Sequence, residues 1–156
     1  MQKSKALSFD EALSRMAALC SVSEHCESEV RERLQRSGLP AAEIQRVVDR
    51  LYDEGFLDTA RYCHAFSRDR LRFAHWGRVK IQQALRQKGL PEADVREALD
   101  ALPEDIYRQV LDEALEQKAR SLRDEDEYTR RGKLIRFAAG RGFTMGEILE
   151  AMGSEE

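Results

Sequence analysis

A pattern of residues that recurs along this 156-residue chain constrains its fold more than any other feature. The tripeptide Gly38-Leu39-Pro40 returns as Gly89-Leu90-Pro91, 51 residues later. At the same offset, six apolar positions coincide without a gap: Val30 with Ile81, Leu34 with Leu85, Ile44 with Val95, Val47 with Ala98, Val48 with Leu99, and Leu51 with Leu102. These matches predict that one folded unit occurs at least twice in the chain.

A third, weaker copy ends the chain. Gly142-Phe143 takes the place of Gly89-Leu90 at an offset of 53 residues. The apolar positions of this copy are Leu134, Ala138, Ile148 and Met152. The proline is absent, and Thr144 followed by Glu147 offers a capping box for a helix in its place.

Within each copy the apolar residues recur at the spacing of an α-helix. In the first copy we predict helices over about residues 8–19, from Ser23 to Gly38, and from Pro40 to Gly55. Ser8 with Glu11 would cap the first of these. The corresponding first helices of the second and third copies are predicted over about residues 58–72 and 103–120.

The predicted fold class is therefore all-α: three tandem three-helix repeats in an elongated, curved arrangement. The predicted domains are residues 1–57, 58–102 and 103–156. A unit of roughly 50 residues is near the lower size limit for an independent core, so neighbouring units should share apolar surface. The long faces of such a row suit a partner that is itself long, such as a nucleic acid or a protein filament.

Charge is segregated along the row. The chain has a net charge of −3, yet residues 58–90 hold eight Lys and Arg against two acids. Residues 128–143 hold five Lys and Arg and no acid, whereas the stretch between the two blocks is strongly acidic. Both basic blocks cover the second helix of a repeat. They indicate a surface for a polyanion or an acidic protein, although such blocks are often only solvated helix faces.

From these blocks we take the candidate partner-binding residues Arg68, Arg72, Arg78, Lys80, Arg130, Lys133 and Arg136. Trp76 joins them with two readings. Its indole is either half exposed beside Arg72 and Arg78, where it would anchor a contact, or it fills the junction between two helices of the second repeat. The second reading is favoured because Trp76 is the only tryptophan and the largest apolar side chain present.

The sequence offers little support for catalysis or metal binding. It has no phosphate-binding loop, nucleophile elbow or dinucleotide fingerprint, so we expect no enzyme activity and no cofactor. Cys20, Cys26 and Cys63 lack the spacing of a zinc site or a disulfide framework. No signal peptide or membrane-spanning run is present, and no heptad seam, so we expect a cytoplasmic monomer.

Two stretches resemble the RecX family of bacterial recombination regulators. Residues 51–71, LYDEGFLDTARYCHAFSRDRL, resemble the family's Gly-hydrophobic-Leu-Asp pattern with a following Arg-Phe/Tyr and an Arg-x-Arg helix end. Residues 75–91, HWGRVKIQQALRQKGLP, resemble its Trp-Gly-x-x-(Arg/Lys)-Ile-x-x-x-Leu-x-x-Lys-Gly signature. Weaker similarity extends from about Phe9 to Met152.

The resemblance implies three three-helix repeats and a regulatory role. Proteins of this kind bind the RecA recombinase, chiefly as its filament on single-stranded DNA, and inhibit its ATPase, co-protease and strand-exchange activities. Some also make weak direct contact with DNA. Two alternatives stay open: a recombinase-independent nucleic-acid-binding helical repeat protein, which the net negative charge disfavours, and a scaffold that joins helical partners through apolar grooves.

Overall fold

The computed structural model describes residues 7–153, and within that range the chain forms nine α-helices and no strand. The first unit holds α1 (Phe9–Val22), α2 (Glu27–Arg36) and α3 (Ala41–Asp53). The second holds α4 (Thr59–Ala74), α5 (Arg78–Gln87) and α6 (Glu92–Asp100). The third holds α7 (Glu104–Ser121), α8 (Glu127–Gly140) and α9 (Met145–Met152).

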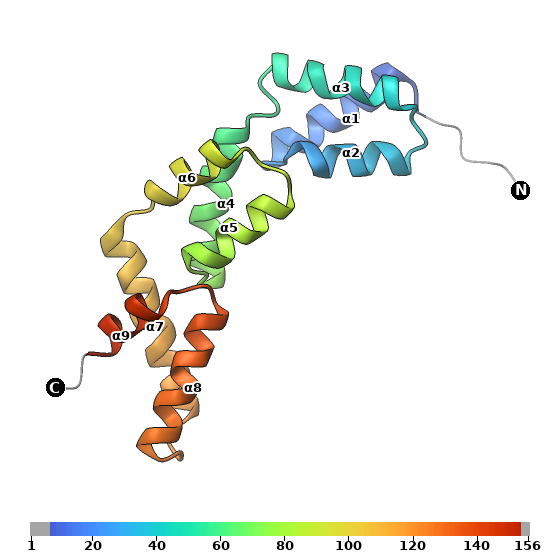
Figure 1. Ribbon diagram of the computed structural model, residues 1–156. Coiled ribbons are helices and arrows are strands. Elements are labelled where there is room, and N and C mark those ends of the chain that lie inside the picture. The colour runs from blue at the N-terminus through green and yellow to red at the C-terminus, as the bar shows by residue number, and fades with distance from the viewer. Residues whose placement is uncertain (1–6, 154–156) are drawn as a thin grey trace, which may run out of the picture.

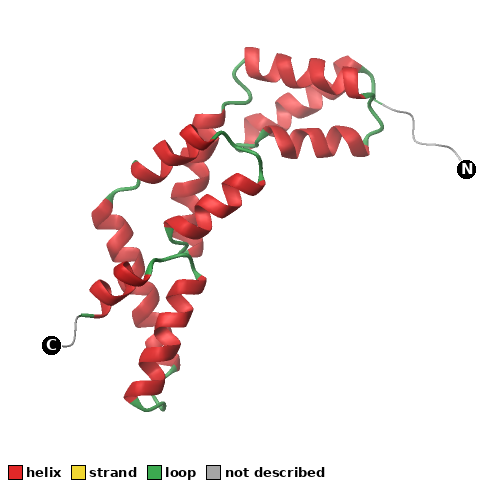
Figure 2. Ribbon diagram, in the orientation of Figure 1, coloured by secondary structure: helices red, strands yellow, loops and turns green. Residues whose placement is uncertain are grey.

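The three units follow one another in a curved row, with the first unit at one end and the third unit at the other (Figures 1 and 2). The predicted all-α, elongated and curved fold class is therefore confirmed. The helices of each unit lie inside the predicted domains 1–57, 58–102 and 103–156, whose exact limits stay a prediction. The outer ends of the first and third domains, residues 1–6 and 154–156, lie outside the described residues.

The paired apolar positions form the cores of the units. All six pairs between the first and second copies are buried, and so are Leu134, Ala138 and Ile148 of the third. The glycine of the repeated tripeptide ends the second helix in the left-handed conformation, with φ of 78° at Gly38 and 80° at Gly89. In both copies the next residue, a leucine, donates its amide to a leucine carbonyl of the helix at 3.2 Å.

Helix ends follow the predicted capping residues with one exception. The Ser8 hydroxyl accepts the Glu11 amide at 3.2 Å, and Thr144 and Glu147 form the expected capping box. The predicted start of the second helix at Ser23 is wrong, because Ser23 ends α1 by donating its amide to the Leu19 carbonyl. The helix instead starts after Cys26, whose amide donates to the Glu29 carboxylate at 3.1 Å.

The apolar residues divide into two cores. The first unit has its own core, which includes Val47 and Leu51. The second and third units share one continuous core that runs from Phe66 through Leu111 to Ile148. Neighbouring units therefore share apolar surface, as predicted: extensively at the second junction, and at the first junction through Cys26, which packs into the core of the second unit.

Close backbone contact joins the second and third units. Gly77, at the start of α5, donates its amide to the Arg141 carbonyl at 2.8 Å, and Val79 donates to the Gly142 carbonyl at 3.0 Å. A Cβ at Gly77 would lie 2.4 Å from the Gly142 carbonyl oxygen, so only glycine permits this approach. The turn between α8 and α9 thus accepts amides at the N-terminus of α5.

Candidate partner-binding groove

Helix α4 is capped by Asp58, whose carboxylate accepts the Arg61 amide at 2.9 Å. It places Tyr62 and Phe66 one helical turn apart, with both rings buried and their centroids 5.8 Å apart. Two turns after Phe66, Phe73 lies past the edge of the core and is 83% exposed. Helix α4 therefore carries an aromatic stripe that runs from the interior to the surface.

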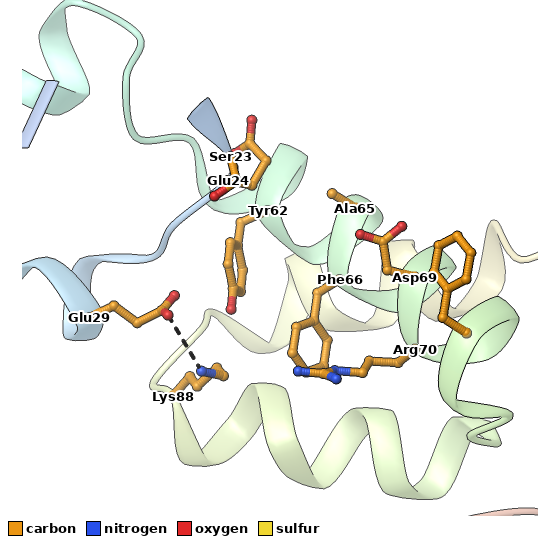
Figure 3. Close-up of a pocket in the computed structure, with 10 residues that line it drawn as sticks. Ser23, Glu24, Glu29, Tyr62, Ala65, Phe66, Asp69, Arg70 and Lys88 are labelled. Atoms are coloured by element: carbon orange, nitrogen blue, oxygen red, sulfur yellow. Dashed lines mark ion pairs between the residues drawn. The ribbon is translucent and has the colours of Figure 1, made fainter. Parts of the chain in front are cut away.

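This stripe forms one side of a groove of about 570 Å³ between the first and second units (Figure 3). The first unit contributes the residues that connect α1 to α2 and the start of α2. The lining residues are Ser23, Glu24, Glu29, Tyr62, Ala65, Phe66, Asp69, Arg70, Phe73 and Lys88. Helix α4 thus supplies most of the lining, and Lys88 follows α5.

Cations cover the aromatic rings beside this groove. The Arg70 guanidinium lies 5.0 Å from the Phe66 ring centroid and 5.1 Å from that of Trp76. The ammonium of Lys80 lies 4.7 Å from the Trp76 centroid, and that of Lys88 lies 5.9 Å from the Phe66 centroid. The negative ring faces hold these cations in place at the surface of the second unit.

The acidic side of the groove is largely neutralised within the protein. Glu24 accepts Arg61 Nε at 2.6 Å, and Glu29 lies 4.0 Å from Lys88 Nζ, as Figure 3 shows. Burial opposes ionisation of Glu29, but hydrogen bonds from Cys26 and the charges of Lys88 and His25 outweigh it and lower its pKa. Glu29 is therefore held as a carboxylate.

Several cations of the second unit form no ion pair with any residue between 7 and 153. They are Arg68, Arg70, Arg72 and Lys80. Arg68 and Arg72 are exposed and one turn apart on α4, so they share a face of that helix. Arg70 lies on another side of α4 and, with Lys80 of α5, covers the Trp76 ring. We call these four residues of the second unit together the cationic surface. It can bind carboxylates or phosphates of a partner.

Trp76 combines both readings of its position. The indole is partly buried and packs against the shared core, with its ring centroid 6.4 Å from that of Phe66 in an edge-to-face arrangement. It therefore fills a junction between α4 and α5. Its remaining surface lies under Arg70 and Lys80, so it supports the cationic surface rather than projecting from it.

The prediction that Arg78 binds a partner conflicts with its position. Its guanidinium donates to the Leu99 carbonyl at 3.2 Å and to Glu104 at 2.6 Å. It also lies 3.6 Å from the Glu147 carboxylate and 4.0 Å from the Tyr107 ring centroid. The contacts with Glu104, Tyr107 and Glu147 join the second and third units, so we assign Arg78 a structural role and leave it out of the cationic surface; that it also binds a partner stays a prediction.

The candidates of the third unit, on α8, differ in their availability. Lys133 forms an ion pair with Glu125. Arg130 is partly buried and Arg136 is exposed, and neither has an ion-pair partner among residues 7–153. Whether Arg130, Lys133 and Arg136 bind a partner, on the same face as the second unit's cations, stays a prediction.

The groove itself was missed at the sequence level. Phe73 lies seven residues after Phe66, and helical periodicity places both on the buried face. Helix α4 extends beyond the core, however, so only Phe66 is covered. The groove also needs Glu24 and Glu29 from another unit, and the spacing of apolar residues carries no information on how the two units are oriented.

Family models of all three RecX three-helix domains match the chain. The first domain matches residues 12–51, the second 58–99 and the third 105–152. A curated protein of Prosthecochloris aestuarii named regulatory protein RecX is 33% identical over 142 residues, which cover 91% of each chain. The chain belongs to the RecX family. A second RecX, from Pseudomonas entomophila, is 34% identical over 125 residues, 80% of this chain and 79% of that protein.

Solved structures of RecX share the fold. The crystal structure of RecX from Lactobacillus salivarius matches with a TM-score of 0.79 over 92% of this chain and 94% of that one, at 15% identity. Another crystal structure, titled regulatory protein RecX, matches with a TM-score of 0.82 over 94% of this chain and 72% of that one, at 23% identity. The curved row of three-helix units is therefore the fold of this RecX chain.

Proposed function

We propose that this RecX protein binds the RecA recombinase filament on single-stranded DNA and inhibits its ATPase, co-protease and strand-exchange activities. The observation that carries the proposal is membership of a family of regulatory proteins, with 33% identity across 91% of both chains. The elongated row of units suits a filament, because it offers contacts at several points along one long partner. The protein acts by binding, without catalysis or a cofactor, and as a monomer in the cytoplasm.

The cationic surface supplies the anchoring contact in this proposal. Arg68 and Arg72 are exposed to solvent. Arg70 lies over the rings of Phe66 and Trp76, and Lys80 lies over that of Trp76, so these two cations are held in place. Cations held in one orientation lose less side-chain entropy when they bind a carboxylate. Inhibition follows if the bound row restrains the movements that neighbouring recombinase subunits make during ATP hydrolysis.

Direct DNA binding is the second candidate, and the exposed Arg68 and Arg72 favour it. The net charge of −3 and the acidic residues of α6 and α7 oppose it, because phosphate would be repelled over much of the row.

The described helices also include none that is long and apolar enough to cross a membrane.

One comparison tests the proposal. The protein is mixed with filaments assembled on single-stranded DNA, with free recombinase and with DNA alone, and binding is measured at several salt concentrations. We expect the tightest binding to the filament and at most weak binding to DNA. Equal affinity for DNA alone and for the filament would favour the second candidate, and no binding to the filament would overturn the proposal.

A further inference from the structure

The two junctions between units are built differently. The second and third units share a core and hydrogen bonds between backbone groups of Gly77, Val79 and the turn after α8. Between the first and second units only one buried residue of the first unit, Cys26, packs into the shared core, and side-chain pairs bridge the rest: Glu24 with Arg61 and Glu29 with Lys88. The first unit is therefore joined by fewer buried contacts and by partly exposed ion pairs, and its angle is the more easily changed.

The groove lies across this weaker junction. Glu24 and Glu29 belong to the first unit, whereas Tyr62, Phe66 and Phe73 belong to the second (Figure 3). A change in the angle between the units must therefore change the width of the groove. By the same linkage, anything that binds both sides of the groove fixes the angle.

The apolar residues of the groove indicate a protein side chain as occupant. Phe73 is 83% exposed on one side, and Val22, next to Ser23 in the lining, is 87% exposed. Buried rings of Tyr62 and Phe66 lie deeper. Exposed apolar residues beside a groove with aromatic walls are typical of a contact that buries a few large apolar side chains.

The charges indicate that this partner is acidic. The carboxylates of Glu24 and Glu29 already have cationic partners within the protein, whereas Arg70 in the groove has none among the described residues. A nucleic acid fits less well, because it carries a phosphate at every nucleotide and would bring several past Asp69, whereas a peptide can present a single carboxylate to Arg70.

We propose that the groove is the docking site for an acidic segment of the recombinase, which inserts a large apolar side chain beside Phe66 and Phe73 and pairs a carboxylate with Arg70. Binding of this segment fixes the first unit relative to the other two. The proposal rests on the proposed function and names the contact through which the filament is recognised.

The first test compares two exposed aromatic residues. Phe73→Ala removes the ring at the groove, and Tyr128→Ala removes a ring that is 90% exposed at the start of α8, away from the groove. We expect Phe73→Ala to raise the Kd for filaments on single-stranded DNA about tenfold or more. Tyr128→Ala should change it less than about twofold. Circular dichroism checks that both variants keep their helices.

The second test measures the angle between units. Spin labels are attached at Ser14 on α1 and Gln83 on α5, which are both exposed. Noncanonical amino acids carry the labels, so that the buried native cysteines need not be replaced. We expect a broad distance distribution in the free protein that narrows on filaments. With Phe73→Ala, bound at saturating concentration, the distribution should stay broad.

The outcomes separate this proposal from the proposed function. If wild type and Phe73→Ala bind filaments equally, the groove is not the docking site, and the proposed function stands. If wild type does not bind filaments, the proposed function fails. If Phe73→Ala weakens binding to DNA alone, the occupant of the groove is DNA. If Phe73→Ala abolishes a dimer that wild type forms, the occupant is a second copy of this chain. Either result would overturn the proposal.

Discussion

Glu29 links the local structure of α2 to the junction between units. Its carboxylate accepts the Cys26 amide at 3.1 Å and the Cys26 thiol at 3.2 Å, and it lies 3.8 Å from His25 Nδ1 and 4.0 Å from Lys88 Nζ. These contacts favour the ionised form and lower the pKa of Glu29 from its ordinary value of 4.5. One residue thus caps a helix and joins two units.

The pKa of Glu29 predicts how stability depends on pH. Because the pKa is lower in the folded protein, the ionised carboxylate adds stability above its unfolded pKa, and that stability is lost as pH falls through the folded pKa. Glu29→Gln should lower the free energy of unfolding at pH 7 by about 1 kcal/mol. Thermal melts from pH 7 down to pH 3 should show the gap to wild type closing on acidification. A constant gap would contradict this assignment.

The close approach of Gly77 to Gly142 predicts a strong effect of one methyl group. Gly77→Ala would place its Cβ 2.4 Å from the Gly142 carbonyl oxygen and 2.7 Å from the Phe143 amide nitrogen, both backbone atoms. We expect destabilisation of about 2 kcal/mol or more, measured by urea unfolding. Gly132→Ala within α8 is the control, since its nearest atom is 3.8 Å away, and it should stabilise by about 0.5 kcal/mol. Equal effects of the two substitutions would contradict the described contact.

At the level of helices, the sequence predicted the order of the helices and most of their ends well, because these depend on residues close together in the chain. The repeated Gly-Leu-Pro turn and the apolar spacing depend only on nearby residues, and both occur in the structure. The start of α2 was missed because Ser23 suits either the end of one helix or the start of the next, and the cap at Cys26 has an unusual side chain.

Contacts between units were the part that could not be predicted. Arg78 belongs to the basic block by sequence, yet Glu104 and Glu147, 26 and 69 residues further along, hold it inside the junction. Charge patterns show where cations occur but not which acids of distant helices will pair with them. The same reason hid the groove, because its two sides come from different units.

The separate core of the first unit predicts two classes of hydrogen exchange. Amides of α3, such as those of Val47 and Leu51, should exchange through an opening that leaves the shared core of the other units closed. We expect their opening free energy to be lower by roughly 1.4 kcal/mol or more, which is a tenfold difference in rate. Native-state exchange followed by NMR measures both sets. A single common opening for Leu51 and Leu85 would contradict a separable first unit.

For the whole molecule, the division into two units with a shared core and a first unit joined by fewer buried contacts fits the proposed binding to a filament. The shared core links the cationic surface of α4 and α5 to the third unit. Under the proposed function, the first junction would let the first unit adjust to the next part of the filament. Solvent-exposed ion pairs are screened by salt, so high ionic strength should loosen the first unit and weaken filament binding together.

The most direct measurement is inhibition of filament ATPase by a charge-reversed variant. Arg68→Glu with Arg72→Glu reverses two exposed arginines of the cationic surface, and Arg33→Glu with Arg120→Glu makes the same change in charge at exposed arginines elsewhere. We expect the first pair to raise the concentration needed for half inhibition by about tenfold or more, and the control pair to change it by less than about twofold. Equal inhibition by the two folded variants would contradict the claim that this surface binds the recombinase.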